Sequence, residues 1–231
     1  MHHHTHGLDK GRLRGIAEEL RHHVPFTLVG ALTGIAIAVL FVYTEMSREV
    51  SGVMFAIFHP AHVFLSALAT AAMYSLHGKR SLAATLVVGY VGAVAIGTLS
   101  DSLIPYLSEL LLGIRDEHVH AHVHLGFIEE WYLVNPLALL GVMVAYWRPR
   151  TKAPHAGHVL LSTWASLFHV LMAISHEGGV GVVTGLMIPV VLFFAVWLPC
   201  CTSDIVFPLL FAPAQKEEVP DPDHATQEGH E

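Results

Sequence analysis

Six long apolar segments restrict the fold of this chain more than any other feature. They cover roughly residues 24 to 44, 52 to 76, 81 to 111, 131 to 147, 157 to 177 and 179 to 212, and a helix of such length can cross the ~30 Å hydrocarbon core of a bilayer. Hydrophobic residues form 53% of the chain and charged residues only 13%, which is unusual for a soluble domain. Because lipid offers no partner to backbone polar groups, we expect an all-α integral membrane protein with six transmembrane helices.

Basic residues near the ends of these segments predict the orientation of the helices. They gather before the first segment, between the second and third, and between the fourth and fifth: Lys10, Arg12, Arg14, Arg21, Lys79, Arg80, Arg148, Arg150 and Lys152. Short cytoplasmic loops carry the excess of Lys and Arg, so both termini are predicted to be cytoplasmic (N-in/C-in). We expect a multi-pass protein of a plasma or inner membrane, with the lipid bilayer as a partner.

The motif Ser-Asp-x-x-x-Pro occurs twice, at residues 100–105 in the third segment and 203–208 in the sixth. Two further landmarks recur in the same order just over a hundred residues apart: Pro25 and Gly30 with Pro136 and Gly141, and Phe58-His59 with Phe168-His169. With three spans per half, the second half would be inserted upside down. This predicts a 3+3 inverted repeat, an architecture of secondary transporters. The alternative is a chance match among residues that commonly pack membrane helices.

Asp101 and Asp204 lie within apolar segments, where ionisable residues are costly and usually functional. Each is followed four residues later by a proline, Pro105 or Pro208. Proline lacks an N–H, and its ring crowds the carbonyl four residues back. We therefore expect a helix break that frees the carbonyl of each aspartate, so that each site offers a carboxylate and a main-chain oxygen to a cation.

Histidine is abundant, with 19 residues, and several lie inside apolar segments. His59 and His62 are three residues apart, which places them on one helical face. A buried imidazole is costly unless it is paired or coordinated. We predict a transport or metal site drawn from His59, His62, Asp101, His169, His176, Glu177 and Asp204. The alternative is that each histidine donates to a carbonyl on a neighbouring helix.

His118, His120, His122 and His124 alternate with other residues, so an extended chain would show all four on one side. Imidazole favours zinc, copper, nickel and iron, which predicts a metal-collecting loop on the non-cytoplasmic side. A solvated or pH-sensitive polar loop is the alternative. Cys200 and Cys201 are close enough to Asp204 in sequence to offer soft ligands, although small packing residues are the simpler interpretation.

The predicted organisation has five parts. Residues 1–23 form a cytoplasmic His-containing tail with an amphipathic helix, 24–112 the first three-helix repeat, 113–130 the non-cytoplasmic His-rich loop, 131–212 the second three-helix repeat, and 213–231 a disordered acidic cytoplasmic tail. Gly30 with Gly34 and Gly181 with Gly185 have the spacing of a helix-dimer motif, which fits a homodimer as well as packing within one bundle. The sequence does not show a surface rich in basic and aromatic residues, so we do not expect nucleic acid as a partner.

These observations favour a secondary transporter of a divalent transition-metal cation that is coupled to protons. Zinc is the first candidate, with nickel, cobalt, iron and manganese as alternatives, and the metal ion would be substrate or bound ligand. A second hypothesis is an integral-membrane metalloenzyme with His59, His62, His169 and Asp101 as ligands. The chain has none of the motifs His-Glu-x-x-His, Gly-x-Ser-x-Gly or Cys-x-x-Cys, so we favour the transporter. A third hypothesis is a proton-coupled carrier of a small organic solute.

Overall fold

Helices account for the architecture, and no strand occurs among residues 21, 24–25, 28–30, 32–37, 40, 48–78, 81–113, 123–150, 152–173 and 182–212, which this computed structural model describes. Within the described residues, four helices are long and apolar enough to cross a membrane: Arg48–His77, Leu82–Leu112, Ala156–Ala173 and Met187–Phe211. Two shorter apolar helices, Leu28–Ile37 and Trp131–Trp147, fall on the first and fourth predicted segments. The predicted all-helical class with membrane-length apolar helices is therefore confirmed. The six membrane crossings and the orientation of the helices in the membrane remain predictions.

The described elements follow one another in a simple order. They are α2 (Arg48–His77), α3 (Leu82–Thr98), η1 (Leu99–Leu103), α4 (Ile104–Leu112), α5 (Gly126–Glu129), α6 (Trp131–Trp147), α7 (Lys152–Ala173), α8 (Val182–Cys201), η2 (Thr202–Val206) and α9 (Phe207–Phe211). The two π-helical segments, η1 and η2, each join an α-helix to the next without a loop. The chain therefore forms two long helical rods, α3-η1-α4 and α8-η2-α9.

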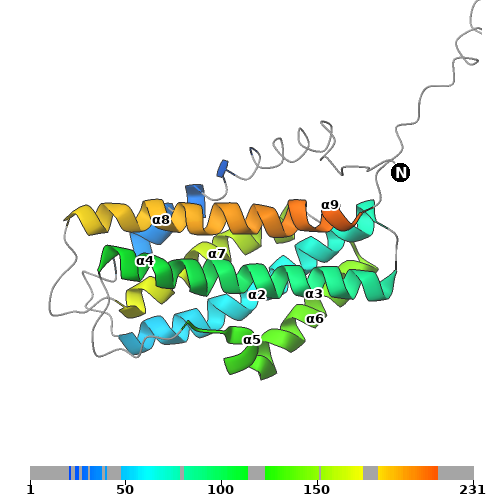
Figure 1. Ribbon diagram of the computed structural model, residues 1–231, viewed down its shortest axis with the longest axis horizontal. Helices are drawn as coiled ribbons and strands as arrows, with labels where there is room; N and C mark the ends of the chain where they lie inside the picture. Colours follow the sequence, from blue (N-terminus) through cyan, green and yellow to red (C-terminus); the bar gives the residue numbers. More distant parts are fainter. Residues whose placement is uncertain are drawn as a thin grey trace, which may run out of the picture.

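Helix α2 lies at the centre of the bundle, where it packs against α3, α6 and α7 and also reaches η2 and α9. The two rods lie side by side and run in opposite directions, because α4 packs beside α8 while α3 packs beside α9 (Figure 1). Helices α2 and α7, which pack closely against each other, are the two central helices. Each contacts one π-helical segment: η1 packs against α7, and η2 packs against α2. This arrangement turns the two Ser-Asp motifs toward the interior.

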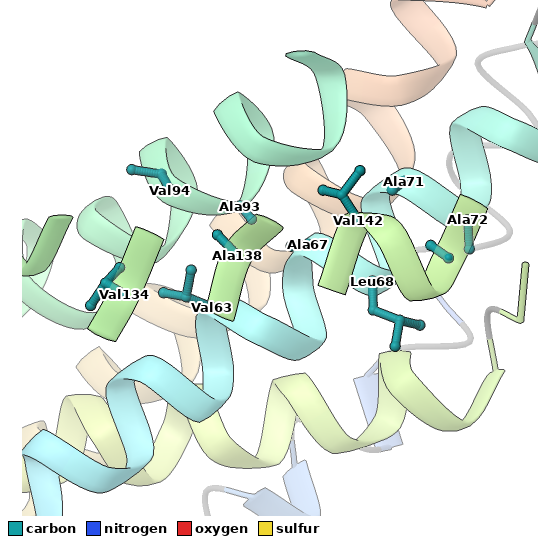
Figure 2. Close-up of a cluster of buried hydrophobic side chains, with 11 residues drawn as sticks. Val63, Ala67, Leu68, Ala71, Ala72, Ala93, Val94, Val134, Ala138 and Val142 are labelled. Carbon is teal, nitrogen blue, oxygen red and sulfur yellow. The ribbon is translucent and has the colours of Figure 1, made fainter. Parts of the chain in front are cut away.

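Small residues bring α2, α3 and α6 into close contact. The buried cluster there contains Val63, Ala67, Leu68, Ala71, Ala72, Ala93, Val94, Val134, Ala138, Val142 and Ala145, and Figure 2 shows these side chains filling the space between the three helices. A Cβ added at Gly141 would meet the carbonyl oxygen of Phe64 and come within 3.2 Å of the Leu68 nitrogen. Close backbone approach of this kind is how helices associate in lipid, where the hydrophobic effect does not drive helix pairing.

Large apolar side chains cover the outside of the bundle, as expected where lipid is the solvent. Leu111 is 87% exposed and Val87 is 62% exposed. Trp131 and Tyr132 at the start of α6 and Trp147 at its end are also exposed. Amphipathic aromatic rings favour the boundary between hydrocarbon and headgroups, so their position at the two ends of one helix is consistent with a role as interfacial anchors.

Several sequence predictions lie outside the described residues. They are the N-terminal tail with most of its amphipathic helix, half of the His-rich loop including His118, His120 and His122, the pair His176 and Glu177, and the acidic tail from residue 213. The division into five parts is therefore still a prediction.

Candidate metal centre

Asp101 is fully buried in η1 and lies at the centre of a hydrogen-bond network. Its Oδ2 atom lies 2.6 Å from His62 Nδ1 and 3.0 Å from His59 Nδ1. Its Oδ1 atom accepts the hydroxyl protons of Ser100 and Ser162, both at 2.8 Å. A carboxylate with four donors around it is well suited to be a buried acceptor. The prediction that His59 and His62 share one helical face holds, since both rings reach the same oxygen.

Asp204 is buried in η2 and has a similar set of neighbours. Its Oδ2 atom lies 3.0 Å from His158 Nδ1, and its Oδ1 atom accepts the hydroxyl of Thr70 at 3.1 Å. Thr70 also lies 3.1 Å from the hydroxyl of Ser203, and Ser66 lies 3.4 Å from the same hydroxyl. Each aspartate thus has an imidazole partner and hydroxyl neighbours, all of them buried.

Apart from Ser100 and Ser203, which precede the aspartates in sequence, the hydroxyl groups at each site come from the opposite half of the chain. Ser162 and Ser166 on α7 contact η1, whereas Ser66 and Thr70 on α2 contact η2. The two central helices carry the same pattern, a histidine followed at four-residue intervals by two hydroxyl residues: His62, Ser66 and Thr70 on α2, and His158, Ser162 and Ser166 on α7. Four-residue spacing places all three members of each set along one face of their helix.

The carbonyl that loses its N–H donor to the proline lies one residue earlier than the sequence predicts. In a π-helix the N–H bonds the carbonyl five residues back, and the N–H of Ile104 does bond the carbonyl of Leu99. Pro105 has no N–H to offer the next carbonyl, which is that of Ser100. The hydroxyl of Ser166 donates to this Ser100 carbonyl at 2.9 Å. The expected break with a freed Asp101 carbonyl is therefore replaced by a continuous helix.

The second motif repeats this arrangement with longer contacts. Pro208 lies five residues after Ser203. The Ser203 carbonyl lies 3.4 Å from the hydroxyl of Thr70, which shares its one proton between this carbonyl and the nearer Oδ1 atom of Asp204 at 3.1 Å. Both prolines therefore leave a carbonyl that a hydroxyl from the other half can reach. It follows that the Ser-Asp-x-x-x-Pro motif builds a docking point for a neighbouring helix.

Ser166→Ala should lower the free energy of unfolding by about 1–3 kcal/mol, because it removes a buried donor from the Ser100 carbonyl. Ser108→Ala is the matched control, since that hydroxyl bonds the Ile104 carbonyl within its own helix and such local bonds contribute little. Thermal unfolding of both variants in detergent measures the difference. Equal midpoints would show that the contact between the halves does not contribute to stability.

Between the two aspartates, three potential metal ligands converge from three helices. His62 on α2, His158 on α7 and Cys200 on α8 each offer one ligand atom, and these atoms all lie within 4.8 Å of one another. All three residues are buried, the rings of His62 and His158 stack with centroids 5.6 Å apart, and Cys200 Sγ lies 4.0 Å from His62 Nε2. Among the described residues this is the one set of three such groups with that spacing.

His59 and His169 lie on the other side of Asp101 in a second group of histidines around Phe55. The Phe55 ring stacks on His59 and meets the rings of His124 and His169 edge-on. His169 Nε2 lies 3.6 Å from the carboxylate of Glu109, which is itself buried. His124, the described member of the His-rich loop, pairs with Glu129 at 2.8 Å.

The sequence interpretation therefore located part of this site and missed part of it. His59, His62, Asp101 and Asp204 do lie in a buried polar layer. The predicted site does not include His158 or Glu109, and packing was the simpler interpretation of Cys200. The repeated His-x-x-x-Ser-x-x-x-Ser/Thr pattern on α2 and α7 is the signal that could have identified His158.

Together these features describe a class of protein: a helical bundle with membrane-length apolar helices and a buried cluster of histidine, cysteine and aspartate between them. No protein-family model, curated protein or solved structure matches this chain. The chemistry of the site is therefore the basis on which a function can be assigned.

Proposed function

We propose that this protein is a secondary membrane transporter for a divalent transition-metal cation, with zinc as the first candidate, and that it exchanges the ion for protons. The observation that carries the proposal is the convergence of His62, His158 and Cys200 at a buried point between three helices. Imidazole and thiolate are the ligands that zinc prefers. Three protein ligands leave a fourth coordination position open, whereas structural zinc sites are closed by four.

The aspartates support metal binding by orienting the imidazoles. His62 Nδ1 faces the carboxylate of Asp101 at 2.6 Å, and a carboxylate accepts, so the ring donates there and keeps the lone pair on Nε2. That atom is the one beside Cys200 Sγ. His158 has the same relation to Asp204 through Nδ1. A carboxylate behind a metal-binding histidine is the usual outer-shell partner in zinc sites.

An inverted repeat of three plus three helices, with both termini in the cytoplasm, would explain why the site has two similar sides. The Ser-Asp-x-x-x-Pro motifs on the antiparallel rods and the histidine-hydroxyl pattern on α2 and α7 support it. In this arrangement each half supplies one histidine and one aspartate to a site at the interface of the repeats, which is where carriers of this architecture bind substrate. Alternating access would then expose the Asp101 side and the Asp204 side in turn.

The proposed exchange of the metal ion for protons is based on the charges of the ion and of the buried aspartates. Two buried carboxylates balance a divalent cation, and an isolated charge in hydrocarbon is expensive. When the ion leaves, protons taken up by the imidazoles or carboxylates can replace its charge. We therefore expect zinc movement in one direction to drive proton movement in the other.

Metal flux into liposomes tests the proposal. The purified full chain is reconstituted into liposomes loaded with a zinc-sensitive dye, and uptake is measured with zinc, nickel, cobalt, iron and manganese in turn. We expect saturable zinc uptake that a proton gradient of opposite direction accelerates. His77→Ala is the control, because this exposed histidine bonds the Met73 carbonyl of its own helix and uptake should be unchanged.

Two results would contradict transport of metal. Stoichiometric metal that stays bound without flux would favour the membrane metalloenzyme, in which the ion activates water or oxygen. An absence of both flux and binding for all five ions would favour a carrier of a small organic solute, with the histidines acting as proton relays.

A further inference from the structure

Cys200 breaks the similarity between the two sides of the site. It precedes Asp204 by four residues, and the residue four before Asp101 is Gly97. A Cβ at Gly97 would come within 3.0 Å of Val63 Cγ2, so that side of the site has little room for a ligand side chain at the matching position. The two halves thus supply equivalent His-Asp pairs, but only the second half supplies a thiol.

The surroundings of Cys200 keep its sulfur near the imidazoles. The residue is 1% exposed and packs with Val159 and Val196, which fix it from the apolar side. Its Sγ atom lies 4.0 Å from His62 Nε2 and belongs to the cluster with His158. Packing alone explains a small buried residue, but a packing role does not require the sulfur to share a ligand-spaced cluster with two histidines that are both backed by carboxylates.

We infer that the Cys200 thiolate is a ligand of the transported ion and restricts the substrate to thiophilic ions, namely zinc and cadmium, over manganese and magnesium. This inference rests on the proposed function and names its substrate class. Thiolate selects soft and borderline ions, whereas manganese and magnesium prefer oxygen ligands. Of the ions that the sequence suggests, manganese therefore becomes the weakest candidate.

Binding of the ion would release one proton from the thiol. A metal–sulfur bond needs the deprotonated sulfur, so the S–H bond breaks as the bond between the metal and sulfur forms, and the proton leaves to solvent. The reverse exchange returns a proton to the sulfur and frees the ion. No oxidant or reductant takes part.

Cadmium titration of the purified full chain in detergent tests the inference. Cadmium bound to thiolate gives a charge-transfer absorption in the ultraviolet, which imidazole alone does not give. We expect this band at one equivalent in the unaltered chain and in Cys201→Ser, and its loss in Cys200→Ser. Cobalt binding, which two imidazoles can still support, shows that the site in Cys200→Ser is folded.

Selectivity provides the second measurement. The ratio of zinc to manganese affinity should fall by about tenfold or more in Cys200→Ser, since even an outer-shell change alters metal affinity by about 10- to 100-fold. A band or a ratio unchanged in Cys200→Ser, with zinc flux intact, would overturn the thiolate ligand and leave the transporter standing. Absence of bound metal and of flux in the unaltered chain would overturn both.

Discussion

His62→Ala should reduce zinc affinity by about 100-fold or more, whereas His59→Ala should reduce it by less than about tenfold. The two residues are three positions apart on α2, and their Nδ1 atoms both face the same oxygen of Asp101. Of the two, His62 belongs to the three-helix cluster, with Nε2 beside Cys200. Removing His62 deletes a ligand, while removing His59 deletes one partner of a carboxylate that keeps three others.

Zinc binding by the two variants is measured by calorimetric titration in detergent, with thermal unfolding as a check that each remains folded. A larger loss in His59→Ala than in His62→Ala would place the ion on the Phe55 side of Asp101, among His59, His124 and His169. Equal losses would indicate that both imidazoles bind the ion directly. Either result would contradict a metal site formed by His62, His158 and Cys200.

Asp101→Asn and Asp204→Asn should each reduce zinc flux by about 100-fold, although both changes keep the size of the side chain. Each aspartate orients the histidine that faces the ion and supplies a negative charge that partly balances it. An amide is neutral, and its N–H₂ group would face the donors around it. If both variants lose flux, both halves of the chain take part in transport.

The two variants should differ in how far they lower the free energy of unfolding. Asp101 accepts from four donors, so Asp101→Asn should lower the free energy of unfolding by about 3–5 kcal/mol, because each buried donor left without an acceptor costs about 1–3 kcal/mol. The contacts of Asp204 with Thr70 at 3.1 Å and His158 at 3.0 Å are longer than the shortest ones at Asp101, so Asp204→Asn should cost less. Glu49→Gln, an exposed change at the start of α2, is the control and should alter neither flux nor unfolding. Zinc flux in Asp204→Asn equal to that of the unaltered chain would show that transport does not require the aspartate of the second half.

Much of the buried polar layer could be predicted from the chain alone. An aspartate in an apolar segment must find donors, and Asp101 finds two of them in His59 and His62. Helical periodicity correctly placed these two histidines on one face. The same rule could not say which of them meets the ion, because a single helix face is wide enough for one ring to point toward α8 and the other toward Phe55.

The missed residues depended on contacts between distant parts of the sequence. Cys200 and His62 are 138 positions apart, and they meet because η2, which continues α8 without a loop, packs against α2. His169 attracts attention in the sequence because it lies deeper in its segment than His158, yet it lies by Glu109, whereas His158 lies by Asp204. Depth along a helix is readable from sequence, but the rotation of a helix about its axis follows from packing against its neighbours.

The amino-acid sequence is enough to establish the class of this protein, since apolar segments of this length and a backbone that lipid cannot satisfy leave helices as the outcome. It is also enough to mark Asp101 and Asp204 as residues that need partners. The three-dimensional arrangement was needed to show that a hydroxyl of the other half meets the serine carbonyl in each motif, and that His62, His158 and Cys200 share one point. Such contacts arise because side chains pack between helices, and no local pattern along the chain specifies the geometry of that packing.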